Sequence, residues 1–279
     1  MSWRERKVTL LGRGEIFVRE STGPPNAPTL LLLHGLGATG LLNWRPVFEP
    51  LRRSYRVLVV DHRGHGRGMR IRAPFRLADC ADDVAALTES MGIDRFVAVG
   101  YSMGGPIAQL LWQRHRRRVE GMVLCATACR FASSDRRRLS HAFTPILNVA
   151  GRVAPRRTIR RVAQQYLSDA IADPALRERV MSEVGSSDPV TVGQAAAAVM
   201  RFDSSEWISD VDVPTSIVLT QKDRLVSAAS QRAMADRISD SVIHGVPGDH
   251  SICVTQPSVF VPALEQACAS VVRRARQVR

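Results

Sequence analysis

Lysine is nearly absent from this chain: Lys7 and Lys222 are the only two, so the formal charge of +13 over 279 residues rests almost entirely on arginine. A basic surface attracts polyanions. However, the chain has no zinc-finger spacing, no basic helix with heptads and no repeat that combines aromatic and basic residues, which are the marks of nucleic-acid binders. The sequence therefore predicts no nucleic-acid partner.

Long apolar runs and paired cysteines are also missing. No stretch reaches the roughly 20 continuous apolar residues that a membrane-spanning helix needs, and the N-terminal residues lead into no apolar signal core. The five cysteines include no C-x-x-C pair, so neither a disulfide framework nor a zinc site is indicated. With 45% hydrophobic residues, the chain can bury a full core. These features predict a soluble, cytoplasmic protein with reduced thiols.

What the sequence does contain is a regular alternation of predicted strands and helices. Continuous apolar runs indicate buried strands, and apolar residues at helical spacing indicate helices. Because buried strands that alternate with helices form parallel sheets, we predict an α/β fold with a mostly parallel central sheet and helices on both faces. The predicted strands cover residues 8–11, 15–19, 29–33, 55–60, 96–99, 119–126, 215–220 and 241–246, and the predicted helices cover 77–91, 106–114 and 228–238, with a closing helix that ends at 276.

The alternation breaks between residues 128 and 211, where helix signals follow one another with no strand between them. Asp173-Pro174 and Asp188-Pro189 each combine an N-cap residue with a first-turn proline. We therefore expect residues 1–127 and 212–279 to form the α/β core, and residues 128–211 to form an inserted helical cap.

The most informative motif is Gly100-Tyr101-Ser102-Met103-Gly104, which follows the apolar run 96–99 and precedes a predicted helix. Strand, tight turn and helix is the setting in which G-x-S-x-G presents a nucleophile. The serine is expected to have a strained backbone, and the two glycines leave room for the strand and the helix to approach closely. The motif therefore predicts that Ser102 is a nucleophile.

A serine hydroxyl is a poor nucleophile at neutral pH and needs a histidine base that a carboxylate orients. Active groups gather at the carboxyl ends of parallel strands, and Asp223 and His250 each lie three or four residues past a predicted strand. Asp249 is disfavoured as the orienting acid, because adjacent residues on a loop rarely point at one another. The order Ser102, Asp223, His250 is that of an α/β-hydrolase.

With several motifs in the right order, the sequence resembles the α/β-hydrolase fold family of esterases, lipases and epoxide-hydrolase-like proteins over nearly its whole length. The motifs that carry the resemblance are His34-Gly35-Leu36-Gly37, Asp61-x-Arg63-Gly64-x-Gly66, the G-x-S-x-G elbow, the helical cap, Val213-Pro214-Thr215 before 221–226, and Gly248-Asp249-His250. The resemblance implies that Ser102 is the nucleophile, that His250 is the general base and later the acid, and that Asp223 orients the imidazole. It also implies that the backbone N–H groups of Leu36 and Met103 form the oxyanion hole.

Within this family, a serine at the elbow points to acyl transfer, since epoxide hydrolases and haloalkane dehalogenases of the same fold use a carboxylate there. The resemblance therefore implies cleavage of a carboxylic ester, an apolar small molecule of undetermined acyl and alcohol size, through an acyl-serine intermediate, with no cofactor and no metal. Lactone, thioester or carbon–carbon bond hydrolysis, peracid formation and acyl transfer to an alcohol are alternatives that use the same triad. A receptor that binds a ligand without turnover is a further alternative.

Two competing interpretations concern the loops after the apolar strands. Residues 35–40 match the dinucleotide fingerprint G-x-G-x-x-G, and Asp61 follows about 20 residues later. That fingerprint should open a long helix, whereas Asn43, Pro46 and Pro50 are expected to interrupt the segment. Asp61 could also belong to a metal site with the nearby histidines, but D-x-R-G-x-G is usually a structural turn in this fold, which is the interpretation we favour.

The expected cap is rich in arginine. Residues 130–161 carry nine arginines against the single acid Asp135. A dense positive face attracts anionic lipid or an acidic ligand. We therefore hypothesise that the cap contacts an anionic membrane surface or admits an acidic substrate, with an ordinary solvated surface as the alternative. The sequence predicts no oligomeric state.

Overall fold

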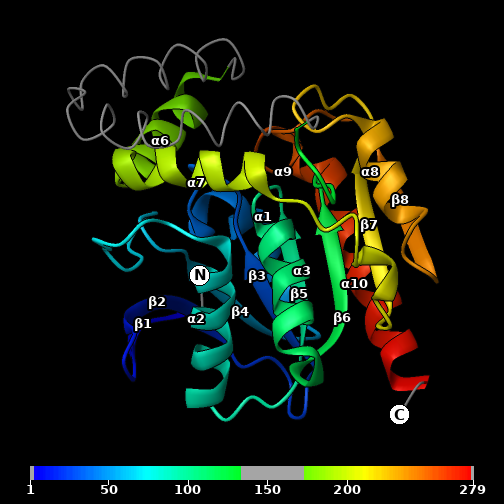
Figure 1. Cartoon of the computed structure of the whole chain (residues 1–279), viewed down its shortest axis with the longest axis horizontal. Coiled ribbons are helices and arrows are strands. Elements are labelled where there is room, and N and C mark those ends of the chain that lie inside the picture. The colour runs from blue at the N-terminus through cyan, green and yellow to red at the C-terminus, as the bar shows by residue number, and fades with distance from the viewer. Residues whose placement is uncertain (1–2, 133–172, 278–279) are drawn as a thin grey trace.

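The structure, a computed structural model, describes residues 3–132 and 173–277 and centres on an eight-stranded sheet (Figure 1). The strand order is β1-β2-β4-β3-β5-β6-β7-β8. β1 pairs with β2, and β2 with β4, in antiparallel fashion, and all the pairs from β4 to β8 are parallel. The strands are β1 (Arg4–Leu10), β2 (Gly14–Ser21), β3 (Thr29–Leu33), β4 (Arg56–Asp61), β5 (Phe96–Tyr101), β6 (Val119–Cys125), β7 (Thr215–Thr220) and β8 (Ser241–Val246).

Helices cover both faces of this sheet. The described helices are α1 (Gly40–Arg52), α2 (Leu77–Ser90), α3 (Gly104–Arg114), α6 (Pro174–Gly185), α7 (Pro189–Arg201), α8 (Ala228–Ala235), α9 (Ile252–Thr255) and α10 (Pro257–Gln277), with 3-10 turns at η1 (Arg116–Arg118) and η2 (Ile208–Asp210). The predicted fold class, a mostly parallel sheet between two layers of helices, is confirmed.

Side chains along β3 show why the core has two halves. Successive side chains of a strand point to opposite faces of the sheet. Leu31 and Leu33 pack in the cluster that includes α2, α3 and α8, whereas Leu30 and Leu32 pack with α1 and α10. A strand that is buried on both faces must be apolar throughout, which explains the continuous apolar run at 29–33.

Helix α1 differs from the prediction. The expectation that Asn43, Pro46 and Pro50 interrupt the segment is wrong, because one helix spans the whole stretch. Thr39 caps its N-terminus by accepting a hydrogen bond from a first-turn N–H. The two prolines lie four residues apart and so share one face, where each removes a backbone donor. The opposite face is buried against the sheet, and this burial keeps the helix continuous.

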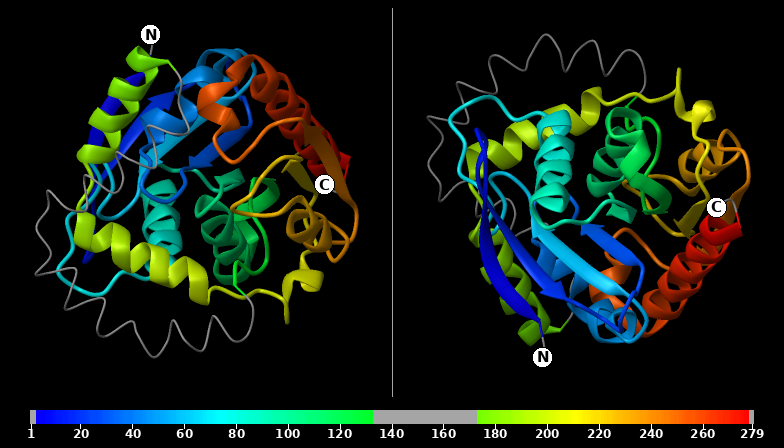
Figure 2. Two further views of the ribbon diagram at one scale, coloured as in Figure 1. Left: turned by 90° about the horizontal axis from the view of Figure 1, so that it is seen from above. Right: turned by 90° about the horizontal axis from the view of Figure 1, so that it is seen from below.

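Helices α6 and α7 lie across the top of the core in Figure 1, and Figure 2 shows them from above. Asp173 and Asp188 accept hydrogen bonds from first-turn N–H groups, so both helices begin where the Asp-Pro pairs predict. The contact with the core is direct: the Thr39 hydroxyl donates to Glu183, and the N–H of Asp188 donates to the carbonyl of Gly64. The two helices therefore cover the loops that follow β3 and β4.

Most of the arginine-rich stretch falls in residues 133–172, outside the residues that the structure describes. The hypothesised contact with an anionic membrane therefore stays a prediction, as do the limits of the cap at 128–211. Among the described helices, none is both long enough and apolar enough to cross a membrane. All five cysteines lie in the described part of the chain, and all are buried and unpaired: Cys80, Cys125, Cys129, Cys253 and Cys268.

Candidate active site

Ser102 stands on the sharp turn between β5, which ends at Tyr101, and α3, which begins at Gly104. Its backbone φ is 51°, in the left-handed region that residues other than glycine rarely adopt. The N–H of Ser102 donates to the carbonyl of Cys125 at 2.9 Å, which ties the strained residue to the end of β6. The turn therefore holds the serine side chain in one direction.

The glycines of the G-x-S-x-G motif are needed because strand and helix nearly touch at this turn. A Cβ atom on Gly100 would collide with the carbonyl of Gly104, and a Cβ atom on Gly104 would collide with the carbonyl of Leu33. A Cβ atom on Gly35 would lie 3.2 Å from the Cβ of Ser102. The loop after β3 thus packs directly against the serine.

His250 and Asp223 form a hydrogen-bonded chain with Ser102. The distance from His250 Nε2 to Ser102 Oγ is 2.9 Å, and that from His250 Nδ1 to Asp223 Oδ2 is 2.7 Å. Because an ionised carboxylate only accepts hydrogen bonds, Nδ1 carries the proton and Nε2 presents its lone pair to the serine hydroxyl. The His250 side chain stays 20% exposed, so a small molecule can reach it. The structure thus brings together the three residues that the sequence singles out.

Further donors hold Asp223 in its ionised form. The N–H groups of Leu225 and Val226 each donate to Oδ1 at 2.8 Å, and the Thr220 hydroxyl donates to Oδ2 at 2.8 Å. Burial acts to raise the pKa of Asp223, but the hydrogen bonds and the neighbouring His250 outweigh burial and lower the pKa below its usual value. Asp223 is therefore a carboxylate at neutral pH and orients the imidazole.

Thr220 and Gln231 support the site but were missed by the sequence reasoning. The side chain of Gln231 accepts a hydrogen bond from the Thr220 N–H at 3.1 Å and donates one to Thr220 Oγ1 at 2.7 Å. The hydroxyl proton of Thr220 is then left for Asp223. Gln231 is fully buried, and a polar residue on the inner face of the predicted helix 228–238 was the one available signal.

Leu36 lies in the loop after β3, and Met103 follows Ser102 directly in the elbow. Within the part of the chain that the structure describes, neither N–H donates a hydrogen bond to another residue. The carbonyl of Gly35, by contrast, accepts from His34 Nδ1 at 2.8 Å. Because a trans peptide holds its C=O and N–H on opposite sides, this bond also orients the N–H of Leu36. Among the described residues both N–H groups are thus without an acceptor, and their role as an oxyanion hole stays a prediction.

Asp61 and Asp249 have other partners. Asp61 accepts hydrogen bonds from the N–H of Gly40 at 2.8 Å, from Arg19 at 3.2 Å and from the N–H of Arg67 at 3.0 Å. This buried carboxylate ties the loop after β4 to the start of α1, so the structural-turn interpretation of D-x-R-G-x-G is confirmed. The dinucleotide interpretation would instead need Asp61 to bind the ribose of a nucleotide, and the carboxylate already has these three partners. Asp249 accepts from the Ser251 hydroxyl and N–H, as expected of a residue that does not orient His250.

Three buried histidines cluster behind the loop after β3. The ring of His34 lies 4.5 Å from that of His62 and 5.2 Å from that of His65, measured between centroids. His34 Nε2 accepts from the N–H of His62 at 2.9 Å, and His65 Nδ1 donates to the carbonyl of Arg63 at 2.9 Å. Among the described residues, no three His, Cys, Asp or Glu side chains converge to hold a metal ion. Burial lowers the pKa of all three imidazoles, so they are neutral at pH 7.

The buried imidazole of His65 is expected to make the free energy of unfolding depend on pH. Burial lowers the pKa of His65 from 6.5 to about 3. The unfolded chain therefore takes up this proton first as the pH falls, so His65 contributes stability above pH 6.5 that is lost between pH 6.5 and about 3. The expected loss is up to about 1.4 kcal/mol per pH unit. Urea unfolding at pH 7 and pH 5 measures it.

The matched variant is His65→Asn, which keeps a donor near the carbonyl of Arg63 but cannot take up a proton. Its free energy of unfolding is expected to fall less steeply with acid than that of the wild type. His115→Gln is the comparison variant, because His115 is partly exposed and its Nε2 pairs with Asp82, so its charge is not held off by burial as that of His65 is. An unchanged slope in His65→Asn would contradict the assignment.

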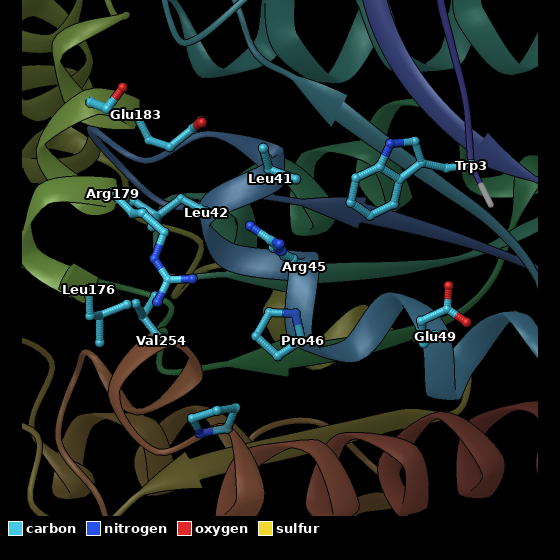
Figure 3. A pocket seen from close by; sticks show the side chains of 12 residues that line it. Trp3, Leu41, Leu42, Arg45, Pro46, Glu49, Leu176, Arg179, Glu183 and Val254 are labelled. Carbon is cyan, nitrogen blue, oxygen red and sulfur yellow. The ribbon is translucent and has the colours of Figure 1, made fainter. Parts of the chain in front are cut away.

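A separate pocket of about 450 Å³ lies between α1 and α6 (Figure 3). Arg45 and Arg179 extend into it from the two helices. None of the residues expected to act in catalysis lines this pocket, so it is not the place where Ser102 would meet a substrate. The lining residues are Trp3, Leu41, Leu42, Arg45, Pro46, Glu49, Leu176, Arg179, Ser182, Glu183, Val254 and Pro257.

Comparison with known protein sequences covers most of the chain. The model of the α/β hydrolase fold family matches residues 28–257. A proposed carbamate hydrolase, RutD, of Caulobacter sp. (strain K31) is 27% identical over 241 residues, which is 85% of this chain and 88% of that protein. The 3-oxoadipate enol-lactonase 2 of Acinetobacter baylyi is 22% identical over 265 residues, which is 93% of this chain and 95% of that protein.

Solved structures have the same fold. A hydrolase from Pseudomonas aeruginosa PA01 superposes with a TM-score of 0.81 at 22% identity, covering 95% of this chain and 98% of that chain. A thermophilic esterase from Thermogutta terrifontis gives a TM-score of 0.78 at 25% identity, covering 96% and 99%. The likeness in fold therefore extends over nearly the whole chain.

Proposed function

Because the chain belongs to the α/β-hydrolase fold family, we propose that it is a serine hydrolase that cleaves a carboxylic ester through an acyl-serine intermediate. The observation that carries this proposal is the hydrogen-bonded chain from Ser102 through His250 to Asp223, at the strained turn after β5. Two relatives support it, since one is named as a proposed carbamate hydrolase and the other as an enol-lactonase.

In the proposed reaction, Ser102 Oγ attacks the ester carbonyl carbon while His250 Nε2 takes the hydroxyl proton, and Asp223 stabilises the imidazolium that forms. The N–H groups of Leu36 and Met103 donate to the tetrahedral oxyanion, an interaction that strengthens in the transition state. His250 then gives its proton to the leaving alcohol as the carbon–oxygen bond breaks. Water repeats the sequence on the acyl-serine and releases the acid.

We extend the proposal to the cap at residues 128–211, which would roof the site and select the acyl or alcohol part of an apolar small-molecule substrate. Support comes from its described part: α6 and α7 contact the loops after β3 and β4 through Thr39 and Gly64. The loop after β3, which the cap contacts at Thr39, also carries Leu36, the proposed oxyanion donor. Ligands that bind between them would lie close to Ser102.

The test is hydrolysis of p-nitrophenyl esters from acetate to dodecanoate, together with a lactone, a thioester and a fluorophosphonate label read by mass spectrometry. Ester or lactone turnover, with one equivalent of label per chain, is the expected result. Turnover of the thioester alone would mean that the substrate is a thioester instead of a carboxylic ester. A folded protein that neither turns over any acyl substrate nor takes the label would overturn the proposal and favour a receptor.

A further inference from the structure

A buried side chain, Asn43 on α1, connects two loops of the candidate site. Asn43 Oδ1 accepts a hydrogen bond from the N–H of Gly35 at 2.8 Å, and Asn43 Nδ2 donates to the Sγ atom of Cys253 on α9 at 3.4 Å. Asn43 is 5% exposed and Cys253 is 1% exposed. One amide therefore joins the loop that carries Leu36 to the short helix just after His250.

Tyr101 continues this connection on the side of the nucleophile. It directly precedes Ser102, and its hydroxyl donates to the backbone carbonyl of His250 at 2.7 Å. Cys253, the partner of Asn43, lies three residues after His250, so the contacts of Asn43 and Tyr101 both end on residues 250–253. The Tyr101 ring also packs edge-on against the ring of His250, with centroids 5.9 Å apart. The elbow and the loop of the base are thus joined at the same point.

The contacts of the two side chains pair each donor with an acceptor. The amide of Asn43 accepts from the N–H of Gly35 and donates to the sulfur of Cys253, and the phenol of Tyr101 donates to the carbonyl of His250. Burial raises the pKa of Tyr101 well above its usual value, so the phenol keeps the proton that it donates, and burial raises the pKa of Cys253 to about 12, so its sulfur stays a neutral thiol. A satisfied buried network of this kind is rigid, since an unpaired polar group there would be costly.

We infer that Asn43, Cys253 and Tyr101, here named the polar bridge, are positioning residues that hold the Leu36 donor and the His250 base in register with Ser102. This inference rests on the proposed serine hydrolase function. The bridge ends on two backbone groups, the N–H of Gly35 and the carbonyl of His250, that are one residue or less from reacting groups. It also occupies the N–H of Gly35, which leaves the N–H of Leu36 to face the oxyanion.

The first test compares Asn43→Ala with the wild type in ester hydrolysis. Loss of the acceptor lets the loop after β3 shift, so kcat is expected to fall about 10- to 100-fold, with KM changed by less than about threefold. Affinity for a trifluoromethyl ketone, which mimics the tetrahedral state, should fall by a similar factor. Asn43→Asp retains an oxygen acceptor for the N–H of Gly35 and should recover most of kcat.

A matched control separates positioning from general stability. Gln109 is also a buried amide, and it hydrogen-bonds the carbonyl of Ala128 and the hydroxyl of Ser204. Gln109→Ala is expected to lower the melting temperature without lowering kcat in the folded protein. If Asn43→Ala behaves in the same way, the bridge is structural only and the inference is wrong.

The second test is a double-variant cycle with Tyr101→Phe. If Asn43 and Tyr101 act through one unit, the double variant Asn43→Ala/Tyr101→Phe should have a kcat no more than about threefold below that of the less active single variant. Multiplication of the two single losses would show independent roles and overturn the inference.

Hydrogen exchange gives a readout that does not require turnover. In Asn43→Ala, amide exchange is expected to accelerate both at residues 34–39 and at 249–252, because the bridge spans the two loops. Acceleration confined to residues 34–39 would contradict the bridge. This readout stands even if the wild type cleaves no ester, in which case the proposed function fails separately.

Discussion

Replacement of Ser102 by alanine is expected to lower kcat/KM for esters by about 10⁴- to 10⁶-fold. In the proposed reaction the variant lacks the oxygen that attacks the carbonyl, while the proposed oxyanion donors, the N–H groups of Leu36 and Met103, would still polarise the substrate, so a small residual rate is expected. Initial rates with purified protein measure the loss, and a fluorophosphonate should no longer label the chain.

The fold should survive this change. Alanine is smaller than serine at a turn that already has a φ of 51°, and the backbone bond from residue 102 to Cys125 does not involve the side chain. Ser90→Ala is the matched control, because Ser90 ends α2 and hydrogen-bonds the carbonyl of Leu87. Ser102→Ala activity within about tenfold of the wild type would show that another group is the nucleophile.

Replacement of Asp223 by asparagine is expected to lower kcat by about 10³- to 10⁴-fold. The reason lies in the two carboxylate oxygens. Oδ1 accepts from the N–H groups of Leu225 and Val226, so the carbonyl oxygen of the new amide would take that place. Its NH₂ group would then face His250 Nδ1, which favours the tautomer with the proton on Nε2. That tautomer cannot accept the proton of Ser102.

Asp249→Asn is the control for this variant, since it changes an acid next to His250 that hydrogen-bonds only Ser251 in the described contacts. Its kcat should stay within about threefold of the wild type. Steady-state rates at pH 7 to 9 distinguish the two variants. An equal loss in both would mean that net negative charge near the imidazole matters more than the specific bond from Asp223.

Much of the fold could be predicted because the signals are local. The continuous apolar run 29–33 requires burial on both faces, and the Asp-Pro pairs at 173–174 and 188–189 carry capping and first-turn chemistry in two residues. The predicted meeting of Ser102, Asp223 and His250 rests on one topological rule, that the carboxyl ends of parallel strands share an edge. These elements need no knowledge of distant contacts.

The rest depends on contacts between segments that are far apart in the sequence. The sequence pattern predicts breaks at the prolines of α1. The helix stays continuous because its opposite face is buried, and this burial is a tertiary effect that the local pattern does not show. Asn43 carried no motif, and its partners, Gly35 and Cys253, lie 8 and 210 residues away. Gln231 supports Asp223 only indirectly, through Thr220 and Val226. Such second neighbours leave no pattern within a single strand or helix.

The five buried thiols can report local unfolding of this protein. An alkylating reagent reaches a buried sulfur only when the surrounding element separates from the core, so its rate reports a local opening free energy. The sulfurs sample five different places: α2, the end of β6, the segment beyond it, α9 and α10, at Cys80, Cys125, Cys129, Cys253 and Cys268. The native sequence thus carries its own set of chemical reporters, one of them next to the catalytic loop.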